Sequence, residues 1–537
     1  MKRRDSDTLR RDSSYGETAM IPMADEIPLS PKRNNKRMLL FGLGAVLVAG
    51  GVAAAVVLST GKSKPTNSSS ESSGNTNTVS PTTNNDLSSV TTAQPKPTSA
   101  GATTAPPPVK SDPEKDPVVM TMLAIGDWGS TTGRGDDGTN PGSCCVLYKS
   151  GPNKHKIDTS LPRYKVDYRS QESVGKLLGM SAAELKPLRV LSHGDNIYWN
   201  GVGEKDVIYR MQETFEKMYS APALQGVPWL NVAGNHDIGG SAYICGDSDS
   251  TFRKCTSTAE MLSYLDKKFD LQAQYVSPNG NRWIMKDHYY VERVTQGGVT
   301  VDIYNLDTNE ATIHGAQQVC CQCFGAGGSD DECDNINPGD KLCAGGDMGM
   351  FNACMDKIQS WADQSYKGAL KDLAASTADF KIINTHYSPQ YHMDPQRMEK
   401  WFNLTRSMGV HAWFNGHTHG FNHDLTSWNT HFFQNGAGGG IKSESPGKVV
   451  GVDGIKPVWV AAGQPYGFME LSFTKEWMKV QFASFDKAWQ FNGGFTSGDI
   501  TPGGIARGHC WFIHKSLDGP GVECKSSTNG VVGLPTR

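Results

Sequence analysis

The chain has 537 residues, a formal net charge of −3 at pH 7 and 12 cysteines. Its isoelectric point is near 6.5, and basic and aromatic residues do not cluster together, so we expect no nucleic-acid partner. The length could hold several domains, but the first 115 residues lack the apolar content of a packed core. Folded structure is therefore expected over residues 116–537.

One long apolar run near the N-terminus predicts a membrane-spanning helix. Residues 38–58 carry no charge and are long enough to cross a hydrocarbon core of about 30 Å. Basic residues are denser before the run than after it, so the positive-inside bias keeps residues 1–37, a disordered tail, in the cytosol. The chain is thus predicted to be a single-pass type II membrane protein with its C-terminal part extracellular or lumenal. The alternative is a cleaved signal peptide, whose apolar core is usually shorter.

A polar segment follows the apolar run. Residues 59–115 are rich in Ser, Thr, Pro and Asn and nearly free of large apolar side chains. Such a composition cannot bury enough surface to offset chain entropy, so a disordered stalk is predicted, open to O-glycosylation. N-glycosylation sequons begin at Asn67 in the stalk and at Asn403 in the folded part.

All 12 cysteines lie beyond the stalk, which favours disulfides in an extracellular or lumenal compartment. Two candidate local pairs are Cys245–Cys255 and Cys510–Cys524, although spacing alone does not fix the connectivity. For the group from Cys320 to Cys354 a zinc cluster is the alternative. That group lacks the paired CxxC spacing of common zinc modules.

Five short apolar runs each end abruptly in Gly, Asn, Asp or His. In chain order they are VVMTMLAIGDWG (118–129), LRVLSHGDNIYWNG (188–201), VPWLNVAGNHDIGG (227–240), FKIINTHYSP (380–389) and VHAWFNGHTHG (410–420). Continuous apolar runs bounded by turn residues are typical of buried strands. The stretches 206–219 and 355–373 have helical character. We therefore expect α/β layers, with ligands gathered at the carboxyl ends of the strands.

Each polar cluster has an ordinary interpretation when it is taken alone. A GD dipeptide after a strand is usually a turn, and GNHD could be a turn with a capping side chain. His417 and His419 point to the same side of an extended segment, but a lone HxH is more often not a metal site. Five such strand ends together indicate a metal centre. Carboxylate, phenol and amide oxygens suit a hard ion such as Fe(III), whereas imidazoles suit Zn, Fe(II) or Mn.

In chain order, the motifs GDWG, GDNIY, GNHD, NTHYSP and GHTHG resemble the signature of the purple acid phosphatases, within the calcineurin-like metallophosphoesterases. The resemblance runs from about residue 118 to 482. It is strongest to the animal-type, tartrate-resistant enzymes, through TFEKMYSAPALQGVPWLNVAGNHD, YNLDT, NGAGGG and GFMELSF. It implies a four-layer α/β/β/α sandwich over residues 116–537.

The resemblance also implies two coordination sets that share one carboxylate, with two ions per chain. The ferric ion would be held by Asp127, Asp195, Tyr198 and His419, and the divalent ion (Fe, Zn or Mn) by Asp195, Asn235, His386 and His417. Many relatives begin with DxH, whereas this chain has Asp127-Trp128-Gly129, and Tyr198 supplies the missing ligand. Because a phenolate prefers Fe(III), this exchange favours a ferric phosphatase over a phosphodiesterase containing only Mn or Zn.

The activity implied by the resemblance is that of an acid phosphatase, which hydrolyses phosphate monoesters by in-line attack of a metal-bound hydroxide. His236 would protonate the departing alkoxide, and an acidic pH optimum is expected. His392 is the candidate for a second outer-sphere histidine, although the family places that residue further beyond His386; the alternative is a surface histidine. His314 and His423 are weaker candidates for the pocket rim.

Asp237 and a cysteine-rich insertion are the remaining candidates near the centre. Asp237 is expected to fix an imidazole, unless it is a plain turn residue. The insertion, about residues 312–355, is expected to be a disulfide-held flap that narrows access, and the alternative is a surface decoration.

Further expectations concern the substrate, the oligomeric state and the alternative functions. The substrate is expected to be a small phosphorylated molecule, and the chain a monomer or weak oligomer. A nucleotidase or pyrophosphatase of the same fold stays open as an alternative. A non-catalytic membrane scaffold would be marked by lost ligands, and all seven ligand positions carry the implied residue types.

Overall fold

The computed structural model describes residues 111–130, 152, 164–240, 243–322, 336–444, 447–449, 451–491 and 500–533. The predicted membrane span, Asn67 and residues 59–110 of the predicted stalk lie outside these residues. Residues 111–115 are described and contact the folded part, because Ser111 Oγ accepts from Trp477 Nε1 at 3.0 Å and Glu114 accepts from the backbone N–H of Lys525 at 2.9 Å, so the prediction of a disordered stalk is wrong for these five residues. Within the described ranges, none of the helices combines the length and the apolar character that crossing a membrane requires. Asn403 is described, and it is exposed on a surface helix.

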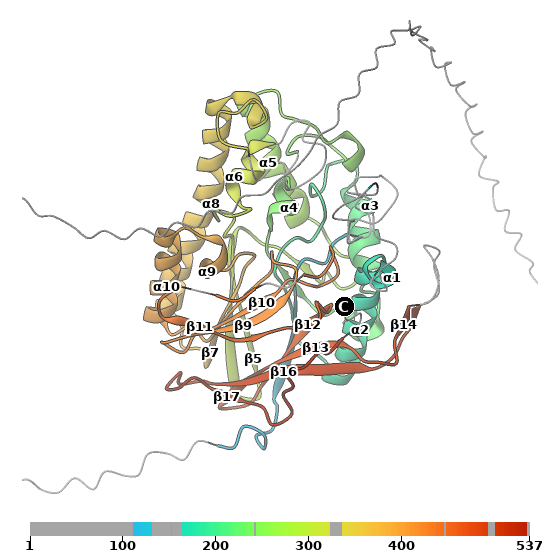
Figure 1. Ribbon diagram of the computed structural model, residues 1–537, viewed down its shortest axis with the longest axis vertical. Coiled ribbons are helices and arrows are strands. Elements are labelled where there is room, and N and C mark those ends of the chain that lie inside the picture. Colours follow the sequence, from blue (N-terminus) through green and yellow to red (C-terminus); the bar gives the residue numbers. More distant parts are fainter. Residues whose placement is uncertain are drawn as a thin grey trace, which may run out of the picture. The chain divides into compact units, whose positions relative to one another are not determined.

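Two β-sheets form the centre of the described structure (Figure 1). The strands of the first sheet, in spatial order, are β17 (Val522–Glu523), β16 (Ile505–His514), β13 (Trp477–Phe485), β12 (Gly467–Phe473), β1 (Met120–Ile125), β2 (Val190–Ser192), β3 (Trp229–Asn231) and β4 (Trp283–Ile284). Those of the second are β11 (Ile455–Val460), β9 (Phe421–Thr426), β10 (His431–Asn435), β8 (Ala412–Asn415), β7 (Phe380–Asn384), β6 (Val299–Leu306) and β5 (Tyr289–Gln296). A separate two-stranded ribbon joins β14 (Gln490–Phe491) and β15 (Ile500–Thr501).

The five strands predicted from apolar runs are all present, and each is shorter than its run. They are β1, β2 and β3 in the first sheet and β7 and β8 in the second. Within each sheet these strands run parallel to their neighbours in this set. Their carboxyl ends therefore meet at one edge, as expected for a ligand site in an α/β fold.

The inner faces of the two sheets pack on each other. Aromatic rings of Phe421 and Phe482 lie 4.5 Å apart, and those of Phe380 and Phe473 lie 5.5 Å apart. Asn384, on β7 of the second sheet, forms hydrogen bonds to the first sheet. Its side-chain amide donates to the carbonyls of Ser192 on β2 (3.3 Å) and Leu230 on β3 (3.0 Å). Such buried amides are costly unless they are bonded, so these bonds fix the register between the layers.

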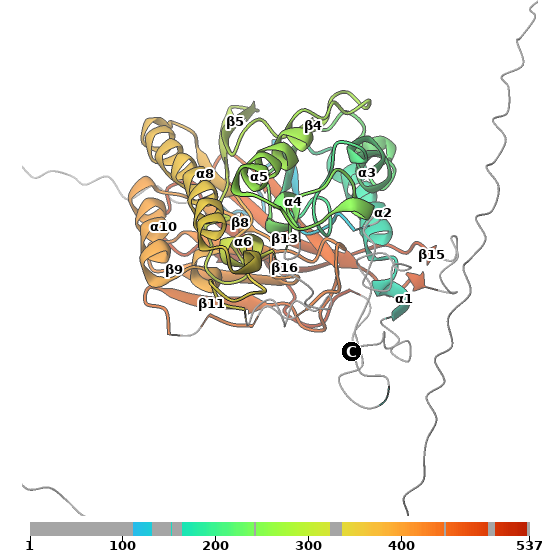
Figure 2. The same ribbon diagram turned by 90° about the horizontal axis from the view of Figure 1, so that it is seen from above.

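Helices cover the outer faces. Helix α2 (Ser170–Leu185) packs on β1 and β12 of the first sheet, and α8 (Met348–Ala375) packs on β5 and β6 of the second. Figures 1 and 2 show α2 and α3 on one side of the sheets and α8 and α10 on the opposite side. The predicted mixed α/β fold is therefore confirmed, and the described elements follow the expected order of layers.

The other α-helices in the described part of the chain are short, apart from α5 and α10. They are α1 (Tyr164–Asp167), α3 (Val207–Met211), α4 (Asn235–Ile238), α5 (Thr258–Ala273), α6 (Ala316–Cys321), α9 (Pro389–His392) and α10 (Pro395–Met408). The predicted helix over 206–219 is α3 continued by a π-helical turn, Gln212–Glu216. Helix α8 starts seven residues earlier than predicted, because the side chain of Asp347 caps it by accepting from the backbone N–H of Met350 at 3.0 Å.

Four disulfides lie among the described residues. Cys245–Cys255 and Cys510–Cys524 form as predicted. Cys320–Cys354 ties α6 to the first turns of α8, and Cys321–Cys343 ties α6 to the loop that precedes α8. These four cysteines of the insertion pair with one another, so the alternative of a zinc cluster at them is wrong. Residues 323–335 of the insertion lie outside the described part of the chain.

Candidate metal centre

The predicted ligands all follow the strand ends that meet at one edge. Their positions are after β1 (Asp127), after β2 (Asp195, Tyr198), after β3 at the start of α4 (Asn235), after β7 (His386) and after β8 (His417, His419). Contacts between side-chain atoms of 3.7 Å or less join all seven residues into one cluster. Residues separated by up to 292 positions in the chain are thus brought together by the parallel strands.

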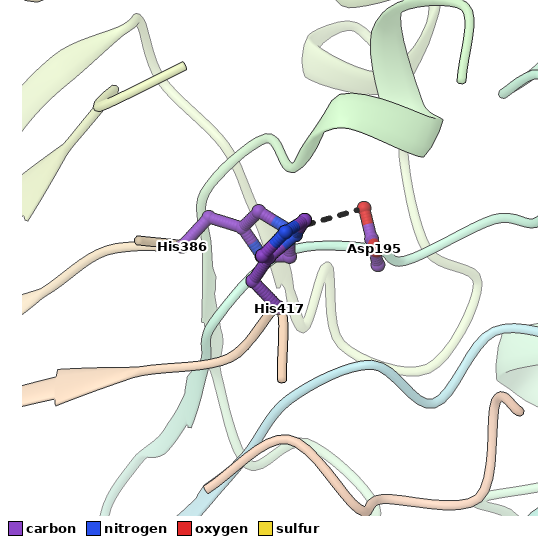
Figure 3. Close-up of side chains that lie close together, drawn as sticks. All are labelled: Asp195, His386 and His417. Atoms are coloured by element: carbon purple, nitrogen blue, oxygen red, sulfur yellow. Dashed lines mark hydrogen bonds and ion pairs between the residues drawn. The ribbon is translucent and has the colours of Figure 1, made fainter. Parts of the chain in front are cut away.

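One half of the cluster is formed by Asp195, His386 and His417, whose ligand atoms all lie within 4.8 Å of one another. Figure 3 shows the Asp195 carboxylate facing the two imidazoles, with His386 Nε2 at 3.5 Å from Asp195 Oδ1. Asn235 Oδ1 completes this half, at 3.1 Å from His386 Nε2 and 3.2 Å from His417 Nδ1.

The other half is formed by Asp127, Asp195 and His419, again with ligand atoms within 4.8 Å of one another. The Tyr198 hydroxyl lies 3.0 Å from Asp195 Oδ2 and 3.3 Å from Asp127 Oδ1. Asp195 belongs to both halves, so its carboxylate occupies the place that the sequence predicts for a bridging ligand.

Three of these residues have left-handed backbone conformations. The φ angles are +55° at Asp127, +52° at Asp195 and +70° at His417. Such conformations cost about 1–3 kcal/mol each for residues other than glycine and persist where the surroundings hold them. The backbone N–H of His417 donates to both carboxylate oxygens of Asp127 at 3.0 Å, and that of His236 donates to Asp195 Oδ1 at 3.0 Å. These bonds aim the carboxylates into the cluster.

The electrostatics of the cluster fit cation binding. Burial, together with the charge of Asp195, raises the pKa of Asp127 and of the Tyr198 phenol well above their ordinary values. Two buried carboxylates and a phenol this close repel one another when ionised, and bound cations would remove that cost. The donors are carboxylate, phenol and amide oxygens with imidazole nitrogens, a set suited to a hard ion beside a borderline one.

Two further groups orient the imidazoles. His386 Nδ1 donates to the carbonyl of His193 at 2.7 Å, which leaves Nε2 as the lone-pair nitrogen facing Asp195. Glu444 Oε1 lies 3.3 Å from His419 Nδ1 and accepts from the His419 backbone N–H at 3.1 Å. The sequence did not predict Glu444, because it lies outside the five motifs and 25 residues beyond its partner.

Tyr387 is another functional residue that was not singled out, although it lies inside the NTHYSP motif. Its buried hydroxyl is 3.1 Å from Asn235 Oδ1 and 2.9 Å from the carbonyl of His314. It therefore links a predicted ligand to the first residues of the insertion. The His314 ring is exposed and its centroid lies 6.0 Å from that of His417, which agrees with the predicted place at the rim.

The insertion starts beside the cluster. The backbone N–H groups of Thr312 and Ile313 donate to the carbonyl of His392 at 2.9 and 3.0 Å. This anchors the first residues of the insertion against α9. A role as an access flap stays a prediction.

His236 and His392 both lie next to predicted ligands. His236 Nδ1 donates to the Trp199 carbonyl at 2.6 Å, and its ring centroid is 4.6 Å from that of Tyr198. His392 is buried, which excludes the surface alternative, and its ring centroid is 4.7 Å from that of His417. Its two nitrogens contact Ser388 Oγ at 3.0 Å and Thr418 Oγ1 at 3.1 Å. His392 is thus engaged by protein groups on both sides.

The predictions for Asp237 and His423 need correction. Asp237 holds backbone rather than an imidazole: its carboxylate accepts from the N–H groups of Asn196 (3.0 Å), Ile197 (3.1 Å) and Gly234 (2.8 Å). His423 is not at the pocket rim. It is buried on β9, with its two ring nitrogens 2.8 and 3.0 Å from nitrogens of His431 and His509. Its position on the inner face of the sheet follows from strand alternation.

A buried carboxylate beside α9 gives a pH-dependent prediction. Burial raises the pKa of Asp424 to about 6, and its main polar contact is the side-chain amide of Gln390 at 3.2 Å. A raised carboxyl pKa stabilises the fold below the unfolded pKa of about 4, and that contribution is lost as pH rises through about 6. Asp424→Asn should therefore raise the free energy of unfolding at pH 7.5 by up to about 3 kcal/mol, and change it little at pH 4. Denaturant unfolding at both pH values checks this; equal effects would contradict it.

Comparisons with known proteins agree with this geometry. The family model described as calcineurin-like phosphoesterase matches residues 120–421, more than half of the chain. Tartrate-resistant acid phosphatase type 5 of Sus scrofa is 31% identical over 120 residues, which is 22% of this chain and 26% of the relative. The matched segment thus spans about a quarter of that relative's length.

Solved structures are similar at low sequence identity. GAP50, the anchor in the inner membrane complex of Plasmodium, aligns with a TM-score of 0.40 and 13% identity, covering 73% of this chain and 90% of that one. Purple acid phosphatase PPD1 of yellow lupin (Lupinus luteus) aligns with a TM-score of 0.37 and 13% identity, covering 78% of this chain and 57% of that one. The family match and the converging ligand residues lead to one conclusion: the chain belongs to the calcineurin-like phosphoesterase family of metal-dependent hydrolases.

Proposed function

We propose that the chain is an acid phosphatase that hydrolyses phosphate monoesters at a dimetal centre. The observation that carries the proposal is the Asp195 carboxylate, which is shared by two ligand groups, one of them completed by the Tyr198 phenol. We assign Fe(III) to the half with Asp127, Tyr198 and His419, and a divalent ion (Fe, Zn or Mn) to the half with Asn235. Two bound cations would supply Lewis-acid activation of the phosphate ester and of the attacking water.

His236 is the residue that we assign to the leaving group. Its Nδ1 proton is committed to the Trp199 carbonyl at 2.6 Å, so Nε2 is the nitrogen that can carry a second proton and deliver it. A departing alkoxide is a poor leaving group unless it is protonated, which gives this histidine a chemical task.

We also propose that the chain is a type II membrane protein whose catalytic part faces the cell exterior or a lumen. The uncharged run over residues 38–58 supports an anchor. Four disulfides among the described residues and an exposed sequon asparagine, Asn403, are compatible with the secretory pathway. Protease protection of the C-terminal part in sealed microsomes tests this; digestion of that part from the cytosolic side would contradict it.

The activity is tested with the full chain, produced in a eukaryotic secretory host and purified in detergent. We expect hydrolysis of an aryl phosphate monoester with an acidic optimum, and much slower hydrolysis of the matched diester. The ratio of kcat/KM values for a nucleoside monophosphate, pyrophosphate and the aryl ester separates a general phosphatase from a nucleotidase or pyrophosphatase. A preference for the diester would contradict the proposal.

A further inference from the structure

Three successive backbone carbonyls beside the metal centre are each held by a nitrogen side chain. They belong to Tyr198, Trp199 and Asn200, the segment that carries the phenol ligand. The Tyr198 carbonyl accepts from Arg210 Nη2, the Trp199 carbonyl from His236 Nδ1, and the Asn200 carbonyl from Lys268 Nζ. Residues 198–200 form a turn, and the three donors come from α3, α4 and α5, so these contacts hold the backbone of the turn from three different helices.

Arg210 is a buried cation of α3, with 1% of its surface exposed. Its Nη1 lies 3.7 Å from a carboxylate oxygen of Asp206 and 3.5 Å from one of Asp249. The two carboxylates compensate its charge, while its other terminal nitrogen reaches the Tyr198 carbonyl. A buried guanidinium with this arrangement is tied to one geometry, because removing any partner would leave a charge unpaired.

Lys268, on α5, is buried to the same extent, with 1% of its surface exposed. Its ammonium nitrogen lies 3.6 Å from the centroid of the Phe252 ring and donates to the Asn200 carbonyl. Burial, reinforced by the charge of Arg210, holds its pKa well below the ordinary value. Burying an amine in this way costs several kcal/mol unless the amine forms hydrogen bonds. The hydrogen bond to the Asn200 carbonyl offsets part of this cost, so Lys268 and the carbonyl hold each other in place.

A disulfide-closed loop covers both cations. The bridge Cys245–Cys255 closes the loop, which supplies Asp249 to Arg210 and the Phe252 ring to Lys268. The backbone N–H of Asp249 also donates to Asp206 at 2.7 Å, which fastens the loop to the start of α3. The two cations are therefore enclosed between this loop and the segment 198–200.

We propose that Arg210 and Lys268 are positioning residues that fix the backbone of residues 198–200, and through it the Tyr198 phenol and the His236 imidazole. The spectroscopic and kinetic consequences rest on the proposed function. The Tyr198 hydroxyl must stay within reach of Asp127 and Asp195, at 3.3 and 3.0 Å. His236 shares the same segment through the Trp199 carbonyl, so one backbone shift would move both side chains.

Lys268→Met tests the proposal, because it keeps much of the apolar stem and removes the donor. In the full-chain holoenzyme we expect kcat to fall about 10- to 100-fold, as for a displacement near 1 Å at a reacting centre. We also expect the visible absorption band of the phenolate–iron contact to shift, and the amides of residues 197–203 to exchange hydrogen faster. Lys371→Met is the matched control: Lys371 is exposed on α8, which covers the second sheet, and all three readouts should stay unchanged.

A folded Lys268→Met protein with an unchanged band, unchanged kcat and unchanged exchange would overturn the proposal. A purely structural role would lower the melting temperature without moving the band, and that result also contradicts it. If Lys268→Met does not fold, Phe252→Leu removes only the ring over the ammonium; it should reproduce the faster exchange at 197–203, and the proposal fails if it does not. If the wild type lacks iron or activity, the proposed function fails, while the exchange comparison still decides the role of Lys268.

Discussion

Asp195→Asn is expected to lower kcat/KM for a phosphate monoester about a thousandfold or more, because cation stabilisation of the transition state contributes several kcal/mol. The carboxylate of Asp195 takes part in both ligand groups, so its replacement weakens both ion sites at once. The neutral amide also removes the charge that offsets two adjacent cations. Steady-state kinetics and metal analysis of the purified variant measure the two effects.

Asp356→Asn is the control for this change, because Asp356 is exposed on α8 and far in sequence from every ligand. It should leave metal content and kcat/KM unchanged. Asp195→Asn should keep the melting temperature of the metal-free protein, since the fold is held by the packed sheets and the disulfides. An Asp195→Asn protein that retains two ions and full activity would rule out the bridging role.

Gly234→Ala is expected to lower kcat about a hundredfold by displacing the same carboxylate. A β-carbon at residue 234 would collide with Asp195 Oδ1, and would lie 2.6 Å from the Asp195 backbone nitrogen and 2.8 Å from His386 Cε1. The backbone of Gly234, at φ −95° and ψ −177°, suits alanine, so the effect is one of space rather than of conformation. The overpacking should also cost about 1–3 kcal/mol of stability.

Gly519→Ala is the matched control, since a β-carbon there would meet no atom within 4 Å. Its kinetics and unfolding should match the wild type. Metal content of Gly234→Ala is informative as well, because a displaced Asp195 should weaken ion binding. Wild-type kinetics in Gly234→Ala would contradict the prediction that a side chain at residue 234 displaces the Asp195 carboxylate and lowers kcat.

The strand ends and the ligand cluster follow from patterns that the sequence carries locally. Each apolar run stops at its polar motif, and parallel strands bring such ends together whatever separates them in the chain. The assignment of Asp127 and His419 to the same ion came from the resemblance to the purple acid phosphatases, and the shared edge of the parallel strands explains why the two residues meet. The pairing of Cys245 with Cys255 was also predictable from local sequence, because a short loop keeps its two ends close together.

Residues that act through tertiary contacts were not predictable. Glu444 and Lys268 lie outside every motif, and only the fold brings them to His419 and Asn200. His423 was wrongly predicted to lie at the pocket rim. Side chains along a strand alternate between the two faces of the sheet, so an error of one residue in the register places a side chain on the wrong face. Asp237 was assigned to an imidazole, but its carboxylate accepts from the backbone N–H of Gly234, three residues earlier, and from those of Asn196 and Ile197, which only the fold brings close.

Anomalous diffraction from crystals of the active holoprotein tests the central claim most directly. We predict two metal peaks about 3.5–4 Å apart, one on each side of the Asp195 carboxylate. The peak beside Tyr198 should show the iron absorption edge. A fully active protein with a single ion, or with ions that do not contact Asp195, would contradict the account.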